Sequence, residues 1–136
     1  MNNGRFSISV HILILLAAAG DTLLSSDYLA GSININPVLV RKELANLRKH
    51  GLVDSKEGKN GGSWLARPAK QIRLSEVYDM IRQAPIMGQS KNAPNPECRI
   101  GKHINVHLDE LYEDVENTLR KKLSNITLAD FLRQFD

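Results

Sequence analysis

The segment from Asn36 to Pro68 constrains the fold most, because it joins an amphipathic helix directly to a tight hairpin. It opens with Asn-Pro, which is a helix cap followed by proline at the first helical position. The helix is expected to run to about His50, and Gly51 ends it. A glycine-rich tip at 56–62 then separates two short strand candidates, which are Leu52–Ser55 and Ser63–Ala66.

Helical patterns surround this segment. Phe6 to about Ala19 is apolar on nearly all sides, which predicts a buried helix. A short second helix, Asp27 to about Gly31, follows a cap at Ser25 or Ser26, and residues 33–35 form a turn. After a proline-containing loop at 85–96, the remaining helices are expected at Leu74 to about Gln83, at about Ile100 to Leu123, and after the capping-box pattern Thr127-x-x-Asp130.

This order of elements predicts a mainly α fold with a small β-hairpin wing. A winged helix-turn-helix domain would occupy residues 1–83. A loop at 84–99 and a dimerisation helix with a C-terminal helix at 100–136 would follow it.

The charge distribution indicates a partner. Residues 1–73 carry ten Lys or Arg and five Asp or Glu, a net charge of +5, whereas residues 74–136 carry eight and ten, a net charge of −2. A basic front half favours a surface that faces a polyanion. The apolar run Val10–Ala19 resembles part of a signal peptide, but His11 interrupts it and it is too short to span a bilayer. With a single cysteine, we expect a cytoplasmic protein with no membrane partner.

The helix that begins at Asn36 is predicted to read DNA. At 100° per residue, Val40, Leu44 and Leu47 share one face, and small and basic residues share the other. Residues near the N-terminus of such a helix contact base edges, and basic residues further along contact phosphates. The predicted DNA-binding residues of this half of the motif are Ser26, Asn36, Pro37, Val38, Arg41, Lys42, Arg48 and Lys49.

The hairpin tip extends this prediction to a wing. Lys59, Asn60 and Gly61 lie in its glycine-rich turn, where a backbone without side chains can approach DNA closely. Lysine and asparagine suit the minor groove. The pattern of a phosphate-binding nucleotide loop is absent.

The long helix carries a dimer pattern. Apolar residues recur at spacings of four, three, four and four, which is close to a coiled-coil seam. Acidic residues lie on the outer faces of the same helix. The predicted dimer interface consists of Ile104, Leu108, Leu111, Val115 and Leu119.

Five stretches resemble the Rrf2 family of bacterial winged helix-turn-helix transcription regulators. They are RFSISVHILILLA (5–17), NPVLVRKELANLRKHGLV (36–53), GGSWLARP (61–68), NPECRIG (95–101) and ITLADFL (126–132). The resemblance implies a homodimer that binds a palindromic operator, acts as a repressor, and packs its last helix against the partner's winged-helix domain. Cluster-binding members carry three cysteines before the dimer helix, and this chain has only Cys98.

Cys98 is the candidate sensor residue, because a thiol just before a helix N-terminus and near Arg99 and Lys102 has a lowered pKa. A buried, inert cysteine is the alternative. One cysteine gives poor support for an iron–sulfur cluster, so we expect no cofactor. His103 and His107 lie four residues apart and with Cys98 resemble a metal set, but no carboxylate completes it, and we predict no metal site.

No catalytic motif stands out, so we predict that the chain is not an enzyme. The expected function is a sequence-specific DNA-binding regulator that responds to thiol redox state or to a small effector. The alternative is a protein-interaction module, or a regulator that a partner protein controls and that binds DNA weakly by itself. The salt dependence of DNA binding distinguishes the two.

Overall fold

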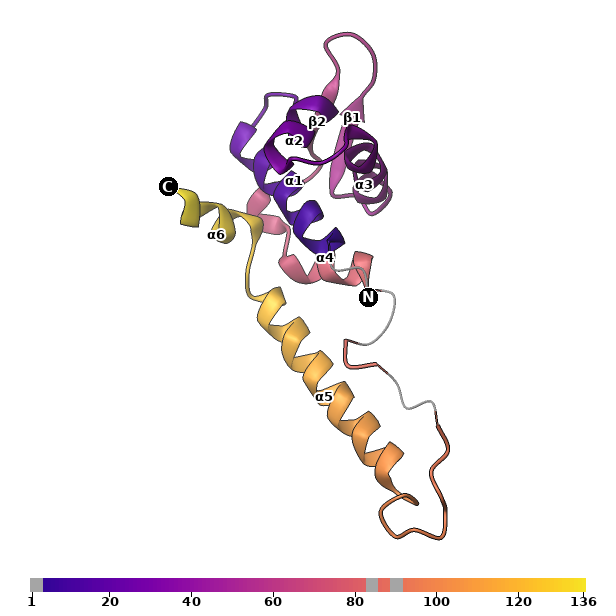
Figure 1. Cartoon of the computed structure of the whole chain (residues 1–136). Helices are drawn as coiled ribbons and strands as arrows, with labels where there is room; N and C mark the ends of the chain where they lie inside the picture. Colours follow the sequence, from indigo (N-terminus) through magenta and orange to yellow (C-terminus); the bar gives the residue numbers. More distant parts are fainter. Residues whose placement is uncertain (1–3, 83–85, 89–91) are drawn as a thin grey trace.

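The computed structural model describes residues 4–82, 86–88 and 92–136. It is mostly helical, with one two-stranded antiparallel sheet (Figure 1). The helices and strands of the described residues are, in chain order, α1 (Arg5–Ala19), α2 (Ser26–Ile33), α3 (Pro37–Lys49), β1 (Val53–Lys56), β2 (Gly62–Leu65), η1 (Ala69–Gln71), α4 (Leu74–Ile81), α5 (Ile104–Ser124), α6 (Leu128–Leu132) and η2 (Arg133–Phe135).

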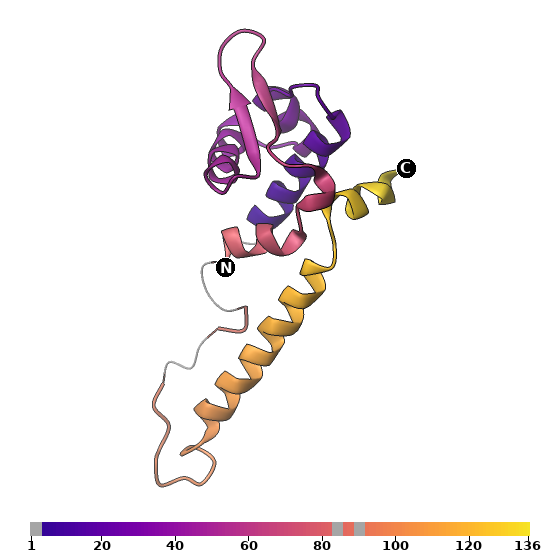
Figure 2. The same ribbon diagram turned by 180° about the vertical axis from the view of Figure 1, so that it is seen from behind.

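Helix α1 lies at the centre of the N-terminal domain. It contacts α2, α3, α4, α6 and β2, and the two opposite views show these elements packed around it (Figures 1 and 2). Its Ile12, Leu13 and Leu16 side chains are almost completely buried. The apolar run at 10–19 therefore forms the core helix, as its composition predicted. No helix in the described ranges is both long enough and apolar enough to cross a membrane.

The hairpin follows α3 as expected, although its strands are each shifted by one residue. Val53 pairs with Leu65 and Lys56 with Gly62. The connection before α2 adds a bridge that the sequence did not reveal: Leu24 and Ser63 exchange both backbone hydrogen bonds, at 3.1 and 2.9 Å. This bridge attaches the returning strand to the loop between α1 and α2, so the base of the wing is fixed to the helical domain.

Three predicted boundaries differ from the structure. Helix α2 continues two residues beyond Gly31, because Asn34 adopts a left-handed conformation (φ 63°) and caps it there. Helix α4 ends at Ile81, and the expected end at Gln83 lies outside the described residues. Helix α5 begins at Ile104 rather than Ile100, since residues 100–103 form turns.

Helix α5 is a rod that extends away from the domain (Figures 1 and 2). Its 21 residues correspond to about 32 Å. Its C-terminal part packs on α4, whereas its other end projects beyond the domain. Of the expected loop at 84–99, residues 84, 85 and 89–91 lie outside the described residues.

Helix α6 packs on α1 of its own chain. Contact of this helix with a partner's domain, which the family resemblance implies, stays a prediction. Leu74 N–H donates to the Ile126 carbonyl and Leu128 N–H to the Ile72 carbonyl, each at 2.9 Å, and Leu128 is fully buried. These two bonds return the chain to its own core immediately after α5. The predicted capping box forms, because Thr127 and Asp130 exchange side-chain to backbone hydrogen bonds at 3.0 Å.

A buried carboxylate joins α4 to α5. Glu116 is only 6% exposed, accepts a hydrogen bond from the Tyr78 hydroxyl at 2.9 Å and pairs with Arg82. Burial acts to raise the pKa of Glu116, but hydrogen bonds from Tyr78 and from the Ile86 backbone and the charge of Arg82 lower it overall. The pKa of Tyr78 is raised mainly by burial and secondly by the hydrogen bond and charge of Glu116. The ionised Glu116 thus stabilises the contact between α5 and α4.

Candidate nucleic-acid interface

Helix α3 attaches to the core through the predicted apolar face. Val40 and Leu47 are fully buried and Leu44 is 7% exposed. The Asn36 side chain accepts a hydrogen bond from the Val38 backbone N–H at 2.8 Å, and Pro37 occupies the first helical turn. The cap and the proline therefore fix where the helix starts, and the apolar stripe fixes which face it turns outward.

The opposite face of α3 is exposed and basic. Arg41, Lys42, Arg48 and Lys49 are all exposed, and so is Asn36. Val38 near the N-terminus exposes 60% of its surface. This face therefore presents four cations and an apolar side chain on a single helix, which is the combination that base edges and phosphates can accept.

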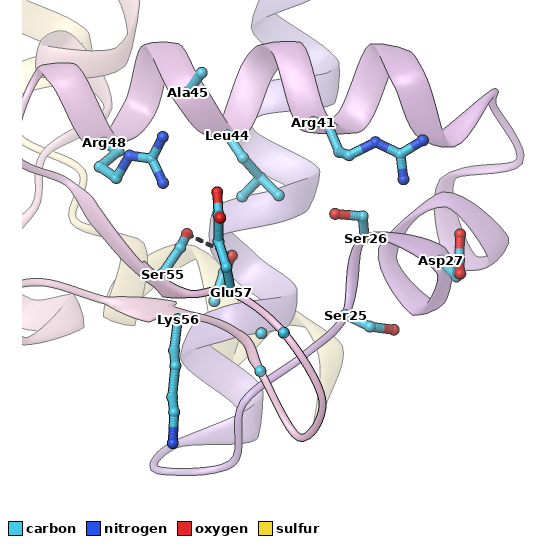
Figure 3. Close-up of a pocket in the computed structure, with 14 residues that line it drawn as sticks. Ser25, Ser26, Asp27, Arg41, Leu44, Ala45, Arg48, Ser55, Lys56 and Glu57 are labelled. Atoms are coloured by element: carbon cyan, nitrogen blue, oxygen red, sulfur yellow. Dashed lines mark hydrogen bonds between the residues drawn. The ribbon is translucent and has the colours of Figure 1, made fainter.

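A polar hollow of about 530 Å³ lies between α3, the start of α2 and the wing (Figure 3). Arg41 and Arg48 line it from α3, and Ser26 lines it from α2. The two serines differ in role. The Ser25 hydroxyl caps α2 by accepting a hydrogen bond from the Tyr28 N–H at 3.1 Å, whereas Ser26 and Arg41 both line the hollow (Figure 3). The hollow therefore gathers two guanidinium groups and a hydroxyl, which can donate to an anion, together with the carboxylates of Asp27 and Glu57.

Glycine is required in the wing turn. A Cβ atom on Gly61 would lie 2.0 Å from the Lys56 carbonyl oxygen, so no other residue fits there. Gly58 has a φ of 87°, which favours glycine. The turn carries Lys59 and Asn60 at its exposed tip. Of the three predicted wing residues, Gly61 is required by the turn and also lines the hollow. Lys59 and Asn60 do not line the hollow and lie at the exposed tip.

Sequence reasoning missed several residues of this surface. Leu39 and Tyr28 are 50% and 58% exposed, and Glu57 lines the hollow. The apolar pattern of α3 gives no sign that Leu39 faces outward, since an exposed leucine breaks the pattern. Glu57 lies in a turn without periodicity, so only the tertiary structure places it opposite α3.

The buried ion pair behind α3 was also missed. The Arg5 guanidinium donates to both carboxylate oxygens of Glu43, at 3.1 and 2.9 Å. Asn46 donates to the same carboxylate at 3.3 Å. Glu43 is 5% exposed, so this pair ties the first residue of α1 to the middle of α3.

Cys98 lies away from the hollow, in the turns before α5. It is exposed, and its Sγ accepts a hydrogen bond from the Gly101 backbone N–H at 3.3 Å. This bond, with a second from the Ile100 backbone, lowers the pKa of the thiol. The backbone donors thus replace the cations Arg99 and Lys102, which the sequence had suggested as the cause. The alternative of a buried cysteine is wrong.

Helices α1, α2 and α3 with the β1–β2 hairpin define a winged helix-turn-helix protein. The chain belongs to the Rrf2 family, described as iron-dependent transcriptional regulators, whose profile matches residues 2–134. Its function is therefore that of a transcription regulator and not of an enzyme.

Individual relatives agree in length and fold. The chain is 35% identical over 132 residues to YwnA of Bacillus subtilis, named as an HTH-type transcriptional regulator, and 97% of each protein is covered. A transcriptional regulator structure from Lactobacillus plantarum has a TM-score of 0.79 at 28% identity, covering 97% of this chain and 89% of the other. CymR, the cysteine regulator of B. subtilis, shares the fold, with a TM-score of 0.74 at 20% identity and coverages of 100% and 98%.

The residues of this chain do not fit an iron–sulfur cluster, which the family resemblance made a candidate cofactor. Such clusters are held by about four protein ligands, usually cysteine thiolates, and Cys98 is the only cysteine in the sequence. Within the described residues, no three His, Cys, Asp or Glu side chains gather as a metal site. His103 precedes α5 and His107 lies near Glu110, at 3.9 Å, on an exposed face.

Proposed function

We propose that this protein is a sequence-specific DNA-binding repressor that acts as a homodimer on a palindromic operator. The observation that carries the proposal is the exposed cationic face of α3 beside the hollow and the wing. Winged helix-turn-helix domains place such a helix in the major groove. Val38 and Lys42 then lie where base edges are read, and Arg48 and Lys49 lie where phosphates pass.

The wing and the start of α2 complete the contact. Lys59 and Asn60 reach the adjacent minor groove, where their donors meet base acceptors. A backbone phosphate between the two grooves meets Ser26, Arg41 and Arg48 around the hollow. In this arrangement the wing tip contacts bases, and the residues around the hollow contact the phosphate backbone.

The homodimer rests on the uncovered apolar face of α5. Leu111 is 52% exposed, and Ile104 and Val115 are 37% and 36% exposed, although all three are apolar. Leu108 and Leu119 are half-buried on the same face. A second copy of α5 would cover this seam, and two-fold symmetry in the protein matches a palindromic operator.

Fluorescence anisotropy of the reduced protein tests DNA binding. The labelled duplex comes from upstream of the gene for this protein, and a scrambled duplex of equal length is the control. We expect tighter binding to the upstream duplex, with an affinity that falls steeply as salt rises because counterions are released. Weak, salt-insensitive binding to every duplex offered would contradict the proposal and support the partner-controlled alternative.

We further propose that the regulator works without an iron–sulfur cluster and that its response to oxidant depends on Cys98. An exposed thiol with a lowered pKa is more often a thiolate, which is the form that oxidants attack. Oxidant should change the affinity of the wild-type protein for its operator and leave the Cys98→Ser variant unchanged. The same oxidant response in both proteins would exclude Cys98 as the sensor.

A further inference from the structure

The hollow beside α3 contains carboxylates that a simple phosphate site would not have: Asp27 from α2 and Glu57 from the wing. Glu57 extends from the wing toward α3, whereas the neighbouring Lys56 side chain points away from α3 (Figure 3). Arg41 and Arg48 line the same hollow. The wing therefore places a negative charge on the surface that faces DNA.

Glu57 differs from Glu43 and Glu76, the two other glutamates of the domain before α4 ends, because both of those are held in ion pairs. Glu43 pairs with Arg5, and Glu76 with Arg67. Across the described part of the chain, the Glu57 side chain has no hydrogen bond or ion pair. Its carboxylate is exposed, and both oxygens remain available to accept hydrogen bonds from a ligand.

The chemistry of DNA decides which ligand group suits this carboxylate. Arg41 and Arg48 attract a backbone phosphate to the hollow, but Glu57 repels it, so Glu57 weakens every complex in which only the backbone reaches the hollow. A base amine is attracted, and the exocyclic amine of cytosine in the major groove is the donor that a glutamate accepts. Both effects favour a matching sequence over a random one.

We propose that Glu57 is a specificity-determining residue, which accepts a hydrogen bond from the exocyclic amine of a cytosine at the edge of the major groove. The proposal deepens the proposed function and rests on it. It assigns base readout to the wing side of the hollow, in addition to the outer face of α3. A good side-chain contact of this kind discriminates against the wrong base by about 5- to 150-fold.

The test is a selection of operators from a library of randomised duplexes, followed by affinity measurements. The wild-type protein is compared with Glu57→Gln, which keeps the shape of the side chain and removes its charge. Asp54→Asn is the matched control, since Asp54 is an exposed carboxylate of the same hairpin that does not line the hollow. Thermal unfolding of the three proteins checks that both variants are folded.

We expect the wild-type and Asp54→Asn proteins to select the same motif with a fixed cytosine. Glu57→Gln should lose the preference for that cytosine by about 5-fold or more and move toward adenine, which pairs well with a glutamine amide. It should also bind scrambled duplex more tightly than the wild type does, because one repulsive charge is gone.

Two outcomes would overturn the inference, and they are distinguishable. If the wild type selects a motif and Glu57→Gln selects the same motif, Glu57 reads no base and the proposed function stands. If the wild type selects no motif, the proposed function fails and this inference fails with it.

Discussion

The ion pair between Arg5 and Glu43 makes a sharp prediction about stability. Glu43 lies in the middle of α3 and is almost fully buried, and its side chain receives two hydrogen bonds from Arg5 and one from Asn46. The hydrogen bond to Glu43 raises the pKa of Arg5 above its ordinary value, so the Arg5 guanidinium is held in its charged form. Removing Arg5 would leave a buried carboxylate with a single weak partner.

The Arg5→Met variant keeps a side chain of similar length and removes the charge. Breaking a buried ion pair from one side costs about 3 to 5 kcal/mol. Because the Arg5 side chain remains 19% exposed, water can partly replace it, and we expect a loss of about 2 to 4 kcal/mol. For a chain of this size the midpoint temperature should fall by roughly 6 to 20 °C.

Thermal and urea unfolding followed by circular dichroism measure this loss. All variants are compared at one protomer concentration, since dimerisation makes apparent stability depend on concentration. Arg120→Met is the matched control: its pair with Asp79 at 2.7 Å leaves the side chains 46% and 44% exposed, so we expect a loss below about 1 kcal/mol. Equal losses in the two variants would refute the argument that burial sets the strength of the Arg5–Glu43 pair.

A double variant tests whether the loss in Arg5→Met comes from the unpaired Glu43 carboxylate. Replacing Glu43 with leucine in the Arg5→Met background removes the unpaired charge and leaves two apolar side chains in contact. We expect this protein to regain most of the stability that Arg5→Met loses, since an apolar pair of similar volume often replaces a buried ion pair at little cost. A double variant that is less stable than Arg5→Met would show that Glu43 is well solvated without Arg5.

Four further predictions concern the Asn36 cap of α3, the exposed basic face of α3, the contact of Glu116 with α4, and the apolar face of α5. Asn36→Ala should lower stability by about 1 kcal/mol, seen as a lower urea midpoint with an unchanged slope, because the Val38 N–H loses its acceptor. Lys42→Ala should reduce discrimination between operator and scrambled duplex, whereas Lys49→Ala should weaken both alike; anisotropy that shows the same pattern for both would contradict the assigned roles. The pKa of Glu116 is lowered in the folded state, so its contribution is present above the unfolded value near 4.5 and is lost as pH falls through the folded pKa. The difference in melting temperature between wild type and Glu116→Gln should therefore be largest at neutral pH and shrink below about pH 4.5. Leu111→Asp should shift the protein to monomer in light scattering, because a charge in the seam would be desolvated; an unchanged mass would place the dimer contact elsewhere.

Local signals in the sequence determined where α3 and α6 begin and which face α3 buries. The Asn36 cap, the Thr127 and Asp130 box and the stripe of Val40 and Leu47 appear in the structure as predicted. Each depends on residues within one or two helical turns, so the physics is contained in a short stretch of sequence. The hairpin was predictable for the same reason, since its turn needs glycine at a particular place.

The tertiary structure decided how these elements meet. The Leu24–Ser63 bridge, the return of α6 to its own domain and the Arg5–Glu43 pair join residues that are far apart in the chain. The sequence around one residue of such a contact does not indicate which distant residue it will meet. The hollow that brings Glu57 opposite α3 arises only after the wing has been fixed to the helices, because its walls come from three separate segments. Local propensity therefore set the elements, and long-range packing built the surface on which the proposed function depends.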